Sequence, residues 1–203
     1  MNNMNYQKMT MTPTEVFVAN DFAEKVAKNI DEKDFMDDRN VRRTLQKVKE
    51  DNFKGKLAEM YIVNVLGYNG DIAKIDINIY EKGIGDDFDV TSNGKSIDVK
   101  ASSPRAKWLM VEDKKITLWE KNGVPDVVCM VAVSGETCTY LFGCTYKVFQ
   151  KKAQYLKRGE KIPNTNTMLK ANNYAIHMDN CSDSIIRLMS FIKEARSVIQ
   201  REN

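Results

Sequence analysis

The sequence predicts an α/β protein in which helices cover a central mixed β-sheet. Residues 12–15 (Thr-Pro-Thr-Glu) combine a capping threonine, a proline suited to the first helical position and a glutamate that completes a capping box. The stretch 125–133 contains a continuous apolar run with the length of a strand that is covered on both faces. Residues 88–101 alternate like the two strands of a hairpin around Asn93-Gly94.

The N-terminal part of the chain is predicted to be helical. Residues 1–11 are polar and rich in Met and Asn, which favours a loose terminus. Within 12–50, apolar side chains recur at helical spacing and predict two helices. These side chains are Ala19, Phe22, Ala23, Val26, Ala27 and Ile30 in the first helix, and Val41, Leu45 and Val48 in the second. The remaining residues, 51–203, are expected to form the core, so that 1–203 is a single domain.

The core is predicted to begin with a helix over 52–66, which Gly67 ends. Isoleucines that alternate with polar residues over 75–79 then indicate a half-buried strand before the hairpin. After the apolar run, we expect a paired strand over 137–145, a helix over 146–157, a short strand over 172–178 and a closing helix over 182–201.

Composition limits the class of protein without identifying a partner. The hydrophobic content of 42% and charged content of 29% are ordinary for a globular protein, and the net charge is only +3. The chain opens without a secretory signal and contains no run of membrane-span length. The four cysteines form no Cys-x-x-Cys pair, which is typical of thiols in a reducing compartment. We therefore expect a cytoplasmic protein with no membrane partner.

Positive charge is concentrated in two segments. Residues 38–56 hold seven Lys/Arg against three Asp/Glu, and residues 147–170 hold seven against one. Basic rims on either side of an acidic site would hold the phosphates of a nucleic acid. Two solvated helix faces would produce the same pattern.

The hairpin gathers opposite charges on one patch of the sheet. A tight turn at Asn93-Gly94 places Asp89 opposite Asp98, and strand alternation puts Lys100 on the same face as Asp98. Since like charges directly opposite each other destabilise a sheet, a divalent metal ion between the two acids is expected. A turn of four residues would put Asp87 in the place of Asp89, and Asp86 competes for the same role.

This hairpin resembles the core of the PD-(D/E)xK nuclease superfamily, which includes restriction endonucleases, Holliday-junction resolvases and repair nucleases. The superfamily pattern matches Asp89 on the first strand and Asp98 and Lys100 on the second, with Phe88 in place of the usual proline. Many members add a glutamate on the preceding helix, and Glu59 fits that position. The resemblance implies a restriction-endonuclease-like fold of α/β/α layers with a central mixed β-sheet and an N-terminal helical segment.

The resemblance also implies an activity, a Mg²⁺-dependent endonuclease that hydrolyses DNA phosphodiester bonds in restriction, junction resolution or repair. Asp89, Asp98, the carbonyl of Val99 and Glu59 would hold Mg²⁺, for which Mn²⁺ would substitute. Lys100 would orient the attacking water or stabilise the developing negative charge. The alternatives for Glu59 are a partly exposed acid or a structural ion pair with Lys56, three residues earlier on the same helix.

Further residues are expected to contact the substrate, a duplex or branched DNA. Ser102, Ser103, Arg105 and Lys107 follow the second hairpin strand and would bind phosphate. Trp108 is expected to belong to the core or, alternatively, to stack on a base. The small size favours a homodimer that cuts both strands; the apolar stripe of the closing helix would form either its interface or part of the core.

Two other readings of the same residues remain open. A catalytically inactive nucleic-acid-binding module would keep the fold without turnover. An acidic hairpin that binds a structural Ca²⁺ would make stability depend on metal and would lack nucleic-acid affinity.

Overall fold

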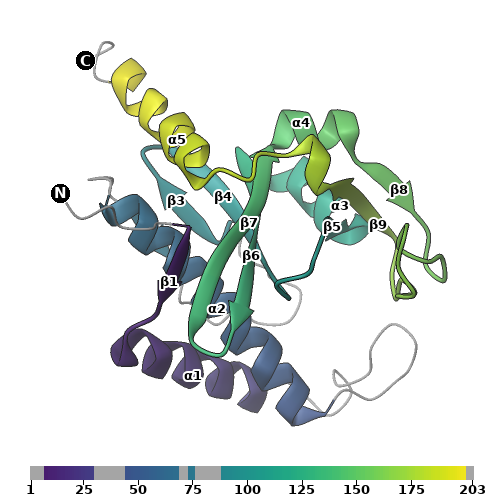
Figure 1. The fold of residues 1–203 in the computed structure, drawn as a ribbon, viewed down its shortest axis with the longest axis horizontal. Helices are drawn as coiled ribbons and strands as arrows, with labels where there is room; N and C mark the ends of the chain where they lie inside the picture. Colours follow the sequence, from purple (N-terminus) through teal and green to yellow (C-terminus); the bar gives the residue numbers. More distant parts are fainter. Residues whose placement is uncertain (1–6, 30–43, 69–72, 76–87, 200–203) are drawn as a thin grey trace.

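The computed structural model describes residues 7–29, 44–68, 73–75 and 88–199, within which it contains two β-sheets and five α-helices (Figure 1). The larger sheet has six strands in the order β1-β7-β6-β4-β3-β2. Its neighbours are antiparallel except β4 and β6, which are parallel, so the predicted mixed sheet is confirmed. Its strands are β1 (Lys8–Thr10), β2 (Ala73–Ile75), β3 (Val90–Ser92), β4 (Lys95–Ser102), β6 (Val127–Ser134) and β7 (Thr137–Thr145).

Strand β6 lies between two layers of buried side chains. Every residue from Val127 to Val133 is buried, as the apolar run predicted. On one face Cys129, with Ile97 and Val99 of β4, packs against α2. On the other face Val128 and Met130 pack against α3 (Asp113–Asn122), α4 (Tyr146–Lys152) and the second sheet. The sheet is therefore covered on both sides.

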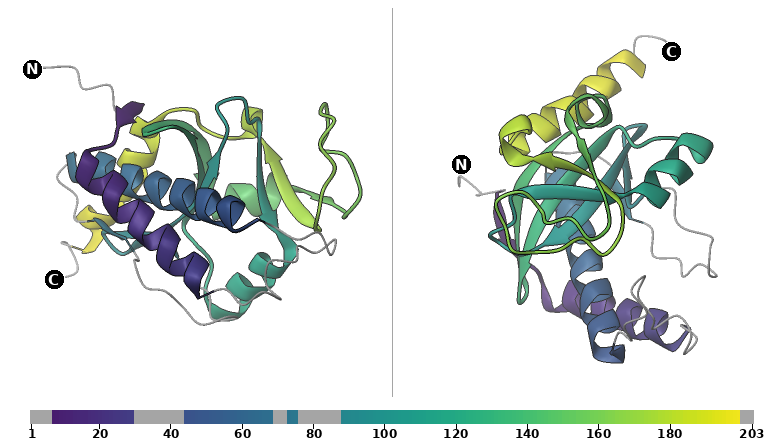
Figure 2. Two further views of the ribbon diagram at one scale, coloured as in Figure 1. Left: turned by 90° about the horizontal axis from the view of Figure 1, so that it is seen from below. Right: turned by 90° about the vertical axis from the view of Figure 1, so that its right-hand side faces the viewer.

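Helix α1 (Pro13–Lys28) begins with the predicted capping box. The Glu15 carboxylate accepts a hydrogen bond from the Thr12 backbone N–H at 2.7 Å, and Thr12 Oγ1 accepts one from the Glu15 N–H at 3.4 Å. The residues that α1 buries are alanines, and small side chains let the helix pack closely along α2 (Figure 2). They are Ala19, Ala23 and Ala27.

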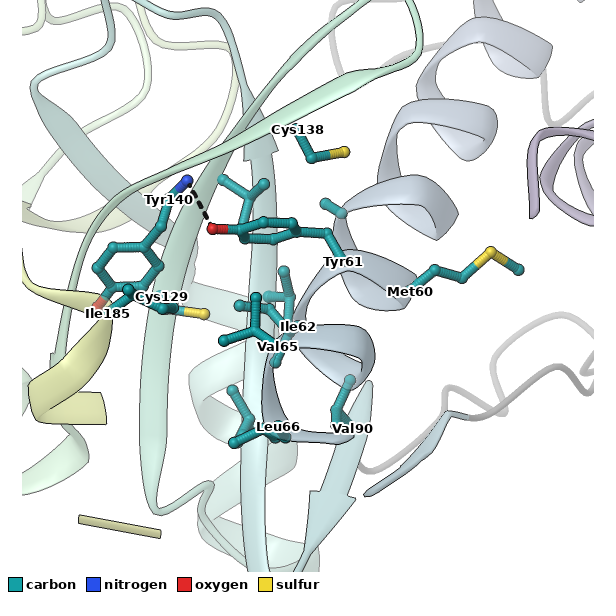
Figure 3. Close-up of a cluster of buried hydrophobic side chains, with 14 of the residues drawn as sticks. Met60, Tyr61, Ile62, Val65, Leu66, Val90, Cys129, Cys138, Tyr140 and Ile185 are labelled. Carbon is teal, nitrogen blue, oxygen red and sulfur yellow. Dashed lines mark hydrogen bonds between the residues drawn. The ribbon is translucent and has the colours of Figure 1, made fainter. Parts of the chain in front are cut away.

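Helix α2 (Leu45–Tyr68) is one continuous helix where the sequence predicted two. No proline interrupts it, and Asn52 sits inside the helix with its side-chain amide donating to the Val48 carbonyl at 2.9 Å. The helix packs on the sheet through a face in which the Tyr61 hydroxyl accepts a hydrogen bond from the Tyr140 N–H at 3.3 Å (Figure 3). Burial raises the pKa of Tyr61, so this hydroxyl stays protonated.

The N-terminal segment is more ordered than the sequence predicted. Lys8–Thr10 pairs with β7 as an edge strand, and the buried Met11 donates its N–H to the Glu136 carbonyl at 2.9 Å. The expectation of a loose terminus is therefore wrong for residues 8–11. This short strand had no signal of its own because its pairing partner lies far along the chain. The isoleucine strand is described only at β2, and Ile77 and Ile79 lie outside the described residues.

A second sheet was not predicted. It has the order β5-β9-β8, with all pairs antiparallel, and lies on the right in Figure 1. Residues 154–156 were expected to continue the helix from Tyr146, but they form β8, and the Tyr155 ring lies 5.1 Å from that of Tyr174 on β9. Tertiary pairing overrides the local helical pattern here. The strands are β5 (Trp108–Glu112), β8 (Gln154–Leu156) and β9 (Asn173–His177).

The closing helix α5 (Ile185–Ile199) buries its apolar stripe in the chain's own core. The buried residues are Ile185, Leu188, Met189 and Ile192. Core packing therefore accounts for these four residues of the stripe. No helix in the described ranges is both long and apolar enough to cross a membrane.

Candidate active site

The hairpin at the centre of the candidate site has the predicted turn and register. Asn93 and Gly94 adopt φ values of 50° and 74°, the left-handed conformation that Asn-Gly accepts readily. Ser92 pairs with Lys95 and Val90 with Ile97, so the register continued by one residue sets Asp89 across from Asp98.

Asp98 and Lys100 form a close ion pair on one face of β4. Lys100 Nζ lies 2.8 Å from Asp98 Oδ1 and 2.7 Å from Oδ2. The Asp98 side chain is 0% exposed and that of Lys100 is 30% exposed. A buried carboxylate is costly unless it is paired, so the ammonium stabilises it while remaining accessible from solvent. Asp98 Oδ2 receives no well-directed hydrogen bond, which leaves an acceptor on this buried oxygen.

Asp89 is fixed to the same strand. The Asp89 Oδ2 atom accepts a hydrogen bond from the backbone N–H of Val99 at 2.6 Å, and Asp89 is 9% exposed. Asp89 lies at a bend directly before β3. The Asp89 carboxylate therefore extends the hydrogen bonding between β3 and β4 beyond their last backbone pair, and this bond holds the carboxylate beside β4.

The three charged groups lie near one another across the sheet. The thiol of Cys129, paired in register with Val99, has its pKa raised by burial and further by the charges of Asp98 and Asp89. Lys100 lowers the pKa of the same thiol. Asp89 is hydrogen-bonded to Val99, the residue between Asp98 and Lys100, so the two acids and the amine lie in the same part of the molecule.

Glu59 does not join this group. Its Oε2 lies 2.6 Å from Lys56 Nζ, and the side chains of Lys56 and Glu59 are 3% and 11% exposed. Lys56 Nζ also lies 4.2 Å from the centre of the Phe22 ring on α1. Glu59 belongs to α2, which covers the face of the sheet opposite Asp98 and Lys100. The structural ion pair, one of the two alternatives for Glu59, is the arrangement found.

Without Glu59, the candidate metal site has two carboxylates, those of Asp89 and Asp98. Across the described ranges there is no group of three or more His, Cys, Asp or Glu side chains that could hold a metal ion. Mg²⁺ keeps several waters and is commonly held by one or two carboxylates, so Asp89, Asp98 and the Val99 carbonyl fit its needs. Asp86 and Asp87, the competing acids, lie outside the described residues.

A cleft of about 600 Å³ opens beyond the end of β4. It brings together the residues predicted to contact the substrate and adds two aromatic rings from the second sheet. Ser102 lies two residues after Lys100 on the same strand, a separation of ~7 Å. The named lining residues are Ser102, Ser103, Arg105, Lys107, Trp108 and His177.

Sequence reasoning did not identify His177 as part of this cleft. The residue pairs with Trp108 across β5 and β9, and the two ring centres are 4.8 Å apart. Their separation along the chain is long, and the short strand around His177 carries no pairing signal. Only knowledge of the β5–β9 register would have found the contact.

Comparisons with protein-family models, curated proteins and solved structures find no match to this chain.

Proposed function

We propose that this protein is a Mg²⁺-dependent endonuclease that hydrolyses DNA phosphodiester bonds on a restriction-endonuclease-like fold. The observation that carries the proposal is the Asp98–Lys100 pair, a buried carboxylate whose amine partner reaches solvent, with Asp89 across the hairpin. In the larger sheet, three antiparallel strands follow α2, and after β5 of the second sheet and α3 comes β6, which is parallel to β4. This order supports the proposal, because the superfamily resemblance implies such an arrangement.

Each residue has a distinct part in the proposed chemistry. Asp89, Asp98 and the Val99 carbonyl would hold Mg²⁺, which neutralises the phosphate and acidifies a bound water. Lys100 is held by Asp98, and its ammonium would orient the water and stabilise the negative charge that develops on the phosphorus oxygens. The water oxygen would bond to phosphorus and give up a proton to solvent, one ester P–O bond would break, and the departing oxygen would take up a proton from solvent. Mn²⁺ would replace Mg²⁺ because it accepts the same oxygen ligands.

The Asp89–Val99 hydrogen bond supports this geometry. It ties the first acid to the backbone of the strand that carries the second, so the separation of the two carboxylates does not depend on loop motion. Preorganised ligands of this kind need no rearrangement during the reaction.

A cleavage assay with isosteric variants tests the proposal. Supercoiled plasmid and branched DNA are incubated with wild type, Asp98→Asn or Lys100→Gln, in Mg²⁺ or EDTA. We expect metal-dependent cleavage by the wild type and a loss of at least 100-fold in each variant, on the order of the effect of losing a key electrostatic group. Equal nicking by wild type and variants would contradict the proposal.

Strand β4 offers a matched control for this assay. At its other end Lys95 Nζ lies 2.8 Å from Asp126 Oδ1, a second Lys–Asp pair whose side chains are 28% and 30% exposed. Asp126→Asn and Lys95→Gln make the same chemical changes outside the proposed site and should leave the cleavage rate unchanged. A single variant leaves one charge of the buried pair without its partner and could unfold the protein. The double variant Asp98→Asn, Lys100→Gln removes both charges, so a loss of cleavage by this folded variant reports on the chemistry and not on unfolding.

A catalytically inactive nucleic-acid-binding module is the second candidate function. The Lys56–Glu59 ion pair favours this candidate. Glu59 is the helical acid of the superfamily pattern, and in this pair it has a structural role and does not bind the metal ion. This candidate requires DNA binding by a wild-type protein that cleaves neither substrate in Mg²⁺ or Mn²⁺. Metal-dependent stability without DNA affinity would instead indicate the structural Ca²⁺ site.

We also propose that the protein acts as a homodimer, so that two sites cut the two strands. Because Ile185, Leu188, Met189 and Ile192 of α5 belong to the core, the interface would use a surface other than these residues.

A further inference from the structure

We infer that the cleft beyond β4 holds an unpaired nucleotide beside the scissile phosphate, so that the substrate is DNA with a single-stranded segment. The inference rests on the proposed function and names its substrate class. The base would stack on Trp108, while Arg105 and Lys107 would bind the flanking phosphates.

The charge of the cleft suits a polyanion. Arg105 and Lys107 line it with exposed side chains, and none of the described residues that line it is acidic. Ser102, Ser103 and Thr165 add hydroxyl groups, which commonly bond to phosphate oxygens. Such a lining attracts a nucleic-acid backbone.

The aromatic wall of the cleft suits a base. Alternation along β5 buries Leu109 and Val111 in one core cluster, whereas Trp108 and Met110 are half-buried on the other face. There they pack against a second buried cluster, as the core reading of Trp108 predicted, and they also line the cleft. The Trp108 ring meets that of His177 edge-on, at an interplanar angle of 64°. Asp179 Oδ2, on a side chain that is 80% exposed, lies 3.1 Å from His177 Nδ1. A half-buried tryptophan held in this way is a rigid stacking surface.

The size and position of the cleft favour one nucleotide. A volume of about 600 Å³ falls within the range of small-ligand sites. The cleft starts at Ser102, ~7 Å along β4 from Lys100, so its occupant would be continuous with a phosphate at the hairpin. A base inside a duplex is already stacked on both faces, and only an unpaired or extruded base can offer a face to Trp108.

Intrinsic fluorescence reports directly on Trp108. The chain has two tryptophans, and Trp119 is 1% exposed, so a ligand in the cleft would quench Trp108. In EDTA, which prevents cleavage, we expect quenching by an oligothymidylate. A duplex of matched length and an abasic oligomer of the same charge should quench far less. The abasic oligomer separates base stacking from phosphate binding.

Variants separate the contribution of base stacking to affinity from that of phosphate binding. Affinity is measured by fluorescence anisotropy of a labelled oligothymidylate. Trp108→Leu should weaken binding by about 5-fold to 150-fold, whereas Trp108→Phe keeps a ring and most of the affinity. Arg105→Ala and Lys107→Ala should each lower the slope of log affinity against log salt by about 0.7. Lys8→Ala, an exposed lysine on the far edge strand β1, is the matched control and should change neither quantity.

The outcomes separate this inference from the proposed function. Equal affinity of Trp108→Leu and wild type for single strands, or equal quenching by duplex and single strand, overturns the inference even if the wild type cleaves plasmid. Trp108-dependent binding of single strands by a wild type that cleaves nothing in Mg²⁺ supports the cleft and overturns the proposed activity.

Discussion

At the scale of single residues, the structure separates two acids that the superfamily pattern treats alike. Asp98 is buried beside an amine that reaches solvent, whereas Glu59 is buried beside Lys56 and the Phe22 ring between two helices. Both are charged groups in a low-dielectric setting, and both need a partner. Only the partner of Asp98, Lys100, is exposed to solvent, where a substrate can reach it.

Glu59→Gln tests this separation. The substitution removes the charge 2.6 Å from the buried Lys56 ammonium, so we expect a loss of about 3 kcal/mol in the free energy of unfolding, measured by urea denaturation. The cleavage rate of the folded fraction should not change. A variant of wild-type stability that cleaves slowly, or binds Mn²⁺ weakly, would instead identify Glu59 as a metal ligand. Lys95→Gln, which breaks a more exposed pair, should cost less than about 1 kcal/mol.

At the scale of elements, local sequence signals predicted structure wherever the partners lie close in the chain. The capping box of α1 and the Asn93-Gly94 hairpin were predicted because each is complete within a few residues. The β1 and β8 strands were not, since each pairs with a distant segment and neither alternates strongly. Likewise, Glu59 fitted the helical position of the superfamily pattern, but the packing of Phe22 on α1 against its partner Lys56 was not readable from the sequence.

The start of α1 provides a pH-dependent test at this scale. Burial would raise the pKa of Glu15, but hydrogen bonds from Asn64 on α2 and from Thr12 outweigh it and lower the pKa below 4.5. A lowered folded-state pKa means that this stabilisation is present above the unfolded-state pKa and is lost as the pH falls through the folded-state value. We expect the urea midpoint of the wild type to fall more steeply than that of Glu15→Gln below about pH 4.5. Parallel curves for the two proteins would contradict the assignment.

At the scale of the whole molecule, the candidate site lies where the two sheets are joined. Strand β4 of the larger sheet carries Asp98 and Lys100, and residues 103–107 connect it to β5, which carries Trp108. The cleft lies along this connection. The sequence predicted the residues on both sides of the cleft, yet not the second sheet, because β5, β8 and β9 are separated along the chain and their pairing has no local signal.

Binding of Mn²⁺ in the absence of DNA, counted by electron paramagnetic resonance, tests most directly whether the hairpin acids hold a metal ion. We predict that the wild type and Asp126→Asn bind Mn²⁺ equally, whereas Asp98→Asn, with an unchanged fold by circular dichroism, loses the bound ion. Equal binding by Asp98→Asn and Asp126→Asn would contradict the account.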